Sequence, residues 1–464
     1  MTVPDSGAPA AGETAVPGET TAPGGRAAPG GAAAPGGAVP GEAVPPGAHR
    51  ARWAATGTFL IVGLVFSSYF VRVPSIKLGH GLSDGQLGLM LVVPSLAALV
   101  AMQLTGGLVA RFGSAPVARL SAAALPVLLL GIALAGDPFQ LALALLLFGA
   151  IDGLVDVSMN AHAIAVERTL RRPVMNGCHA AWSIGAMTGS LVGGFALRAG
   201  LSLTQHYLLL GAIALVFALV IGRYMLPASA DRLAVPAGGR RARVSWLAGW
   251  TPRVVALGVV GAVVLLCEGA VGNWSGVFLH EDRGATLATA SLGYIAFTVC
   301  QTGTRLVGDR LHQRFGALAL VRWSGAFTVA GLATVIASPA PALAVAGFAL
   351  MGLGLAVLLP IVFSAVGHSG AESDAAGAAA ALSKFTTLTY TGLLAGPPLI
   401  GWLAQAFGLP ATLGGLLVLM AGVTLGARIT VSADRSGAAH PGAGHPGTDR
   451  AGAEDAGKAA EPAP

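Results

Sequence analysis

Long apolar stretches alternate with short polar ones along most of the chain. A helix rises 1.5 Å per residue, so a stretch of about 20 residues spans the roughly 30 Å hydrocarbon core of a membrane. The pattern predicts an all-α, polytopic protein of the cell membrane with 12 transmembrane helices. The 12 stretches lie at approximately 53–73, 86–108, 117–136, 139–165, 174–197, 204–225, 254–279, 289–308, 317–338, 341–366, 378–405 and 409–429.

Composition supports this prediction and excludes a soluble protein. Hydrophobic residues make up 54% of the chain and charged residues only 10%, whereas soluble domains carry about 25% charged residues. The net charge of +6 comes from arginines in short loops, so membrane lipid, and not nucleic acid, is the expected neighbour. The ends, 1–49 and 431–464, are rich in Pro, Gly and Ala, and we expect them to be disordered tails.

The distribution of basic residues predicts the orientation. Positively charged residues concentrate in cytoplasmic loops, and this rule places both termini in the cytoplasm. Alternate loops then carry few basic residues outside, namely Arg72, Lys77, Arg198 and Arg283. The inside loops carry Arg50, Arg52, Arg111, Arg168, Arg171, Arg172, Arg232, Arg240, Arg241, Arg243, Arg253, Arg310 and Arg314.

The chain contains an internal repeat. The triplet Arg111-Phe112-Gly113 recurs as Arg314-Phe315-Gly316, an offset of 203 residues, and the same offset relates Gly189 and Gly193 to Gly392 and Gly396. We therefore expect two six-helix halves, 50–225 and 254–430, joined by a basic cytoplasmic linker, 226–253. Two halves in the same orientation are typical of transporters that bind a solute between them.

Three polar residues interrupt the fourth apolar stretch. Asp152, Asp156 and Asn160 are spaced four apart, so on a helix they form one stripe. A charge at the centre of a membrane helix costs at least about 2.5 kcal/mol. Two carboxylates one turn apart also repel each other, which favours a proton on one of them. The stripe predicts a proton-coupling site at Asp156, with Asp152; the alternative is that both aspartates only position helices through hydrogen bonds.

Other polar residues in apolar stretches are candidates for a solute cavity, together with Asn160. They are Glu268, Asn273, Trp274, His179 and Lys384. Intramembrane ionisable groups are functional candidates by default, and Asn273 with Trp274 would offer an amide and an aromatic platform to a polar ring. Trp274 as an interfacial anchor and Lys384 reaching to the interface are the alternatives.

Motifs for enzymatic chemistry are missing from the sequence. It contains no phosphate-binding loop, no HExxH and no nucleophile with a recognisable base. Cys178, Cys267 and Cys300 lack metal-ligand spacing and are interpreted as packing residues. We therefore predict no enzyme activity, no cofactor and no metal, and active transport would have to draw on an ion gradient.

The loop after the second apolar stretch resembles a family motif. Residues 106–113 are similar to G-x-L-x-D-R-x-G-R-[KR] of the major facilitator superfamily: Gly106, Leu108, Arg111 and Gly113 match, while Ala110 replaces the aspartate. The second-half loop with Arg314 and Gly316 is a looser match. The resemblance implies that Gly106, Arg111, Gly113, Arg314 and Gly316 belong to gating loops.

Finer motifs resemble a bacterial branch similar to rhizopine-related transporters, near the fucose permeases. They are Arg72-Val73-Pro74, Asp152-Gly153-x-x-Asp156, Val166-Glu167-Arg168 and His179-x-x-Trp182-Ser183. The resemblance implies alternating access, proton coupling and a small polar or sugar-like solute. Proton-driven efflux of drugs or natural products is the alternative within transport. A membrane sensor that binds a solute without transporting it is the alternative class.

Overall fold

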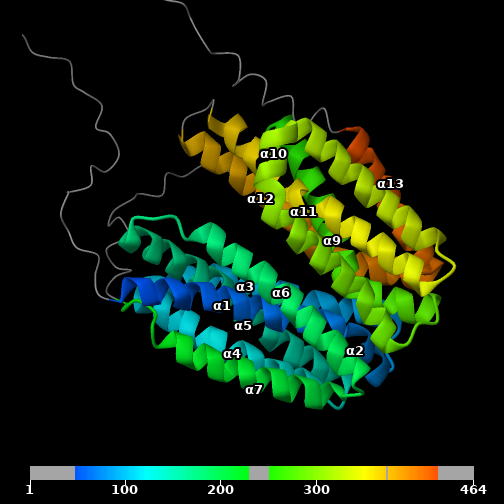
Figure 1. The fold of residues 1–464 in the computed structure, drawn as a ribbon, viewed down its shortest axis with the longest axis horizontal. Helices are drawn as coiled ribbons and strands as arrows, with labels where there is room; N and C mark the ends of the chain where they lie inside the picture. Colours follow the sequence, from blue (N-terminus) through cyan, green and yellow to red (C-terminus); the bar gives the residue numbers. More distant parts are fainter. Residues whose placement is uncertain (1–46, 229–249, 372–374, 427–464) are drawn as a thin grey trace, which may run out of the picture. The chain divides into compact units, whose positions relative to one another are not determined.

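Every regular element is helical in the part of the chain that the computed structural model describes, residues 47–228, 250–371 and 375–426 (Figure 1). This confirms the predicted all-α class. The helices are α1 (Ala48–Val71), α2 (Val73–Gly79), α3 (Asp84–Phe112), α4 (Ser114–Leu134), α5 (Pro138–Leu170), α6 (Met175–Arg198), α7 (Leu203–Gly222), α9 (Pro252–Val277), the π-helix η1 (Phe278–Asp282), α10 (Leu287–Ala337), α11 (Pro341–Ala371), α12 (Ala375–Phe407) and α13 (Leu409–Leu425).

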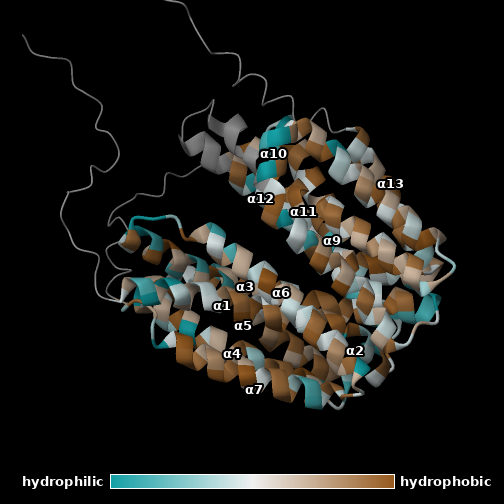
Figure 2. Cartoon of the chain, viewed as in Figure 1, coloured by the Kyte–Doolittle hydropathy of each residue, from teal (hydrophilic) through white to brown (hydrophobic). Residues whose placement is uncertain are grey.

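Each of the 12 apolar stretches coincides with helix to within several residues. Two of them, 289–308 and 317–338, fall within α10, which Gly316 interrupts with a left-handed φ of 75°. Within the described ranges, nine helices are long and apolar enough to cross a membrane, and apolar residues cover most of their length (Figure 2). The number of 12 crossings therefore stays a prediction. The expected tails and most of the linker lie outside the described residues.

The glycines of α6 pack directly against α1. A Cβ atom on Gly185 or Gly189 would lie 2.1 Å from the carbonyl oxygen of Leu60 or Leu64. In the same way, a Cβ on Gly392 of α12 would lie 2.2 Å from the carbonyl oxygen of Ala262 on α9. Small residues allow this approach, which drives association between membrane helices because lipid provides no hydrophobic force.

The offset of 203 residues relates one further pair of helix contacts in both of their members. A Cβ on Gly149 of α5 would meet the Pro94 carbonyl oxygen of α3 at 2.0 Å, and a Cβ on Gly352 of α11 would meet the Phe297 carbonyl oxygen of α10 at 2.3 Å. Both members of the second pair lie 203 residues after those of the first. The repeat therefore relates packed backbone as well as sequence.

The two Arg-Phe-Gly triplets also share one local structure. Gly113 has φ 91° and ψ 159°, and Gly316 has φ 75° and ψ 162°, a backbone that favours glycine. The guanidinium of Arg111 lies 5.2 Å from the Phe112 ring, and that of Arg314 lies 5.4 Å from the Phe315 ring. Gly106, one turn earlier in α3, is exposed with open space around it. The roles of these residues in gating stay a prediction.

Several neutral groups connect helices α1–α7 to helices α9–α13 near α2 and η1, at what we call the α2 end. Ser67 of α1 hydrogen-bonds the Tyr294 hydroxyl of α10 at 3.1 Å. The Gly85 amide at the start of α3 donates to Gln405 Oε1 of α12 at 3.1 Å. A Cβ on Gly88 would lie 2.8 Å from the Pro397 carbonyl oxygen. These contacts leave no room for a side chain between α3 and α12 at this end.

Candidate functional site

The polar stripe of α5 lies on a partly exposed face of that helix. Asn160 Nδ2 donates to the Asp156 backbone oxygen at 2.8 Å and reaches Asp156 Oδ1 at 3.4 Å. Among the described residues, no hydrogen bond or ion pair is found for the Asp152 carboxylate. Next to it, Gly153 faces α3, where a Cβ would lie 2.3 Å from the Ala98 carbonyl oxygen. Packing on α3 thus fixes α5 while both carboxylates keep no cationic partner within the described chain.

Glu268 of α9 belongs to a polar cluster with α10. Its Oε1 accepts a hydrogen bond from Gln301 Nε2 at 2.9 Å and one from Arg305 Nη2 at 3.4 Å. Arg305 Nε also donates to the Ala356 carbonyl oxygen at 3.4 Å. The side chains of Arg305 and Glu268 are 29% and 21% exposed, so the pair is accessible to water or to a small solute. We call Glu268, Gln301 and Arg305 the α9–α10 cluster.

Gln301 and Arg305 were missed by the sequence analysis. Their signal is the one that revealed the aspartates: two polar residues spaced four apart inside an apolar stretch, which form one stripe on a helix. Their association with Glu268, more than 30 residues earlier, has no local signal.

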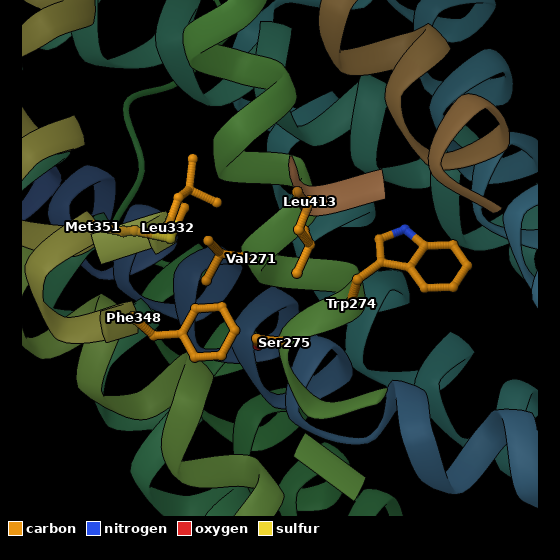
Figure 3. Close-up of a pocket in the computed structure, with 8 residues that line it drawn as sticks. Val271, Trp274, Ser275, Leu332, Phe348, Met351 and Leu413 are labelled. Carbon is orange, nitrogen blue, oxygen red and sulfur yellow. The ribbon is translucent and has the colours of Figure 1, made fainter. Parts of the chain in front are cut away.

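Asn273 and Trp274, adjacent in sequence, lie in different surroundings because successive residues of a helix point about 100° apart. Asn273 is 7% exposed and donates its amide to the Gly269 carbonyl oxygen of its own helix at 2.9 Å. Trp274 is 1% exposed. It lines an apolar pocket with Val271, Ser275, Leu332, Phe348, Met351 and Leu413 (Figure 3). Glu268 is not part of that lining, and contact of Trp274 with a solute stays a prediction.

His179 and Lys384 lie away from the α2 end. The exposed His179 packs edge-on against the Phe59 ring of α1 at 5.2 Å and is within electrostatic range of Arg305. Lys384 Nζ lies 5.6 Å from the Trp250 ring. His179 therefore extends the α9–α10 cluster electrostatically toward α6. Contact of either residue with a solute stays a prediction.

Lys77 joins three elements at the α2 end. Its Nζ donates to Asp84 Oδ1 of α3 at 2.6 Å and to Glu281 Oε2 of η1 at 2.5 Å, with only 7% of its side chain exposed. Burial lowers the pKa of Lys77, but the two hydrogen bonds outweigh burial and raise its pKa above the ordinary value. From the sequence Lys77 is predicted only as a loop charge, since nothing in the sequence marks a partner 204 residues away.

Arg72, the first residue of the Arg-Val-Pro motif, has a structural role in this state. It is 2% exposed. Its Nε donates to His206 Nδ1 at 3.1 Å, and its Nη2 donates to the Leu201 carbonyl oxygen at 2.9 Å. His206 Nε2 in turn lies 3.0 Å from Ser68 Oγ. Arg72 thus ties the end of α1 to the start of α7.

Within the described ranges, no group of three or more His, Cys, Asp or Glu side chains is placed to hold a metal ion. The three cysteines are free.

Comparison with known proteins identifies relatives over most of the chain. Residues 55–385 match the model of the Major Facilitator Superfamily. An uncharacterized MFS-type transporter of Yersinia pestis is 32% identical over 389 residues, which are 83% of this chain and 97% of the relative. Membrane protein MosC of Rhizobium meliloti is 31% identical over 397 residues, which are 85% of this chain and 94% of the relative.

Solved structures share the fold at low sequence identity. A mutant of the nucleoside transporter NupG superposes with a TM-score of 0.64 at 14% identity, covering 83% of this chain and 100% of the other. The D-xylose-proton symporter superposes with a TM-score of 0.63 at 14% identity, covering 83% and 97%.

Proposed function

Because this chain belongs to the major facilitator superfamily of membrane transporters, within the bacterial branch that its motifs indicate, we propose that it couples transport of a small polar or sugar-like solute to protons by alternating access. The chain is a secondary transporter and not an enzyme. The single observation that carries the proton proposal is the carboxylate pair of α5, which has no cationic partner among the described residues.

Asp152 and Asp156 suit proton binding better than Glu268 does. Glu268 shares its charge with Arg305 and accepts a second hydrogen bond from Gln301, so its ionised form is compensated. For Asp156 the only described side-chain partner is the amide of Asn160, at 3.4 Å. Water or a bound proton must compensate the Asp156 carboxylate, because an uncompensated charge inside a membrane is costly. We therefore assign the proton to the α5 pair, with Asp156 as the principal site.

The α9–α10 cluster suits a neutral polar solute. Glu268 Oε2 is a further acceptor, and Arg305 carries donors beyond those that it uses here. Paired donors and acceptors match hydroxyl groups, each of which donates and accepts. The fold shared with a D-xylose-proton symporter and a nucleoside transporter is compatible with such a solute. Asn160, His179, Asn273 and Lys384 remain secondary candidates for contact with it.

The contacts at the α2 end support an assignment of state. With both termini in the cytoplasm, the α2 end faces outward, and the two six-helix halves meet there through α3 with α12 and α1 with α10. We infer that this conformation is closed to the outside. The solute would then reach the α9–α10 cluster from the cytoplasmic side, past His179 and Lys384.

Reconstituted protein tests the proposal with a small panel of polar solutes. Proteoliposomes that contain a pH-sensitive dye are exposed in turn to D-xylose, L-fucose, myo-inositol and uridine. We expect at least one solute to move protons with wild-type protein. Asp156→Asn should abolish accumulation driven by a pH gradient but retain exchange of solute across the membrane. Asp137→Asn is the matched control, since Asp137 caps the same helix and asparagine caps equally well.

Three results would contradict the proposal. Undiminished gradient-driven accumulation by both Asp156→Asn and Asp152→Asn would remove the proton role of α5. Absence of flux for any polar solute, with export of hydrophobic dyes instead, would favour drug efflux. Binding without flux would favour a sensor.

A further inference from the structure

The α2 end contains a charge cluster that the family resemblance does not account for. Lys77 reaches two carboxylates at once, Asp84 on α3 and Glu281 on η1. The contact with Asp84 stays within the first half of the chain, whereas the contact with Glu281 connects α2 to the second half. We propose that Lys77 is a further residue of the transport cycle, which fastens the outer ends of the two halves through Glu281 in the inward-facing state and releases them when the protein opens outward. This inference rests on the proposed alternating-access cycle.

Burial makes this ion pair stronger than a surface pair. An exposed lysine–carboxylate contact contributes about 0–1 kcal/mol because water competes for both charges. The Lys77 side chain is only 7% exposed, and its ammonium donates to two carboxylates at once. Leaving an ammonium buried without its carboxylate partners costs free energy, so the outer ends resist separation as long as water does not reach Lys77.

The same cluster can also open reversibly. The side chains of Asp84 and Glu281 are 23% and 36% exposed, so water is already at the edge of the cluster. When the halves part, water can replace each carboxylate at Lys77, and the ammonium is then no longer buried. The neutral contacts beside it, such as the Ser67 hydroxyl with Tyr294, can likewise be replaced by water.

Removal of Lys77 should leave carboxylates of the two halves to repel each other, in addition to removing the ion pairs. Asp282 lies within electrostatic range of Asp84, Glu281 and Lys77. Without the ammonium, three carboxylates from α3 and η1 face one another, and Arg283, the other cation within electrostatic range of Asp282 among the described residues, is already engaged by the Ile336 carbonyl oxygen at 2.9 Å. Lys77→Gln should therefore push the outer ends apart.

Two cysteine reporters distinguish opening from unfolding, in a background in which Cys178, Cys267 and Cys300 are replaced. Ser67→Cys reports on the outer end, because Ser67 is 1% exposed in this state. His179→Cys reports on the inner end, where the side chain is exposed. An impermeant maleimide labels the outer reporter in right-side-out vesicles and the inner reporter in inside-out vesicles. With Lys77→Gln, we expect labelling at least fivefold faster at the outer reporter and slower at the inner one.

Three further variants calibrate the measurement. Gly88→Trp must wedge α3 from α12, since even a Cβ there would lie 2.8 Å from the Pro397 carbonyl oxygen, so it shows the rate of an outer end forced open. Arg198→Gln removes an exposed basic residue for which no ion pair is found among the described residues, and should leave both rates unchanged. Lys77→Arg keeps the charge and should stay near the wild-type rates.

The labelling rates of Lys77→Gln and Gly88→Trp together test the role of Lys77. An unchanged outer rate in Lys77→Gln, while Gly88→Trp is fast, overturns the role of Lys77 but leaves alternating access intact. If Gly88→Trp is also slow, the proposed cycle itself fails at this face. If both reporters become faster in Lys77→Gln, the variant unfolds and Glu281→Gln replaces it, because that change leaves the Lys77–Asp84 pair in place. Wild-type rates in Glu281→Gln would then refute the inference.

Discussion

Replacing Gly149 and Gly352 by alanine tests whether the two halves pack their helices in equivalent ways. The new methyl group would lie 2.0 Å from the Pro94 carbonyl oxygen in the first case and 2.3 Å from the Phe297 carbonyl oxygen in the second. Carbon and oxygen atoms normally approach to about 3.3 Å at closest. Both helix pairs must therefore separate by about 1 Å, and the obstructing atoms are backbone atoms that no rotamer change can remove.

The expected cost follows from this displacement. Overpacking a core methyl costs about 1–3 kcal/mol, and a gap of about 0.5–1 Å forfeits a quarter to a half of each dispersion contact along the separated helices. We expect each variant to lose about 3 kcal/mol, at the upper end of the range. The two losses should also agree with each other, because the two glycines occupy equivalent positions in the repeat.

Thermal unfolding in detergent, followed by intrinsic fluorescence at one scan rate, measures the loss. Gly131→Ala in α4 and Gly415→Ala in α13 are the matched controls, because nothing lies within 4 Å of a Cβ at either position. Alanine there should change stability by no more than about 1 kcal/mol, in the stabilising direction. A melting temperature of Gly149→Ala or Gly352→Ala equal to that of its control would refute this packing.

Two further predictions concern charged groups. Arg305→Met should destabilise the protein by about 2 kcal/mol, because it leaves the Glu268 carboxylate with Gln301 as its remaining hydrogen-bond partner. Adding Glu268→Gln should restore most of the melting temperature. A double variant no more stable than Arg305→Met would show that the two side chains do not interact. The raised pKa of Lys77 implies that its contribution to the closed outer end is fully present below the ordinary lysine value of 10.5 and is lost only as pH rises through the higher folded value. The thiolate is the form of cysteine that reacts, so the labelling rate of Ser67→Cys is divided at each pH by its rate in the presence of Gly88→Trp. This ratio should stay constant from about pH 7 to 9, and a rise of the ratio within that window would contradict the assignment.

Much of the fold was predictable because the length of an apolar stretch is a local property. It located every long helical segment, including the two that α10 joins across Gly316, where the repeated triplet marked the break, but not the short α2. The hydrophobic pattern could not identify which face of a helix meets which neighbour, since helices that are apolar all round carry little periodicity. Trp274 shows the consequence: its neighbours on α11 and α13 are close only in the folded chain.

The candidate site was predictable to the same extent. Polar residues that interrupt an apolar stretch stood out, which is how Asp152, Asp156 and Glu268 were found. The sequence does not show which residues of distant stretches pair, so the ion pair of Glu268 with Arg305 is seen only in the fold. Lys77 was missed for a further reason: a lysine in a short polar loop is ordinary until a carboxylate from the other half meets it.

The same offset that equates Gly149 with Gly352 shows where the two halves differ chemically. Counting 203 residues on from Asp152, Asp156 and Asn160 leads to Leu355, Leu359 and Phe363, and Phe363 packs edge-on against Phe385 at 4.7 Å. The second half thus has no counterpart of the carboxylate stripe, and Glu268 in its first apolar stretch is compensated by Arg305. A proton bound on α5 would neutralise part of the uncompensated charge of the first half and leave that of the second half unchanged. Closure around a neutral solute would then bury the least charge when α5 is protonated, which is the physical reason to expect proton and solute to cross together.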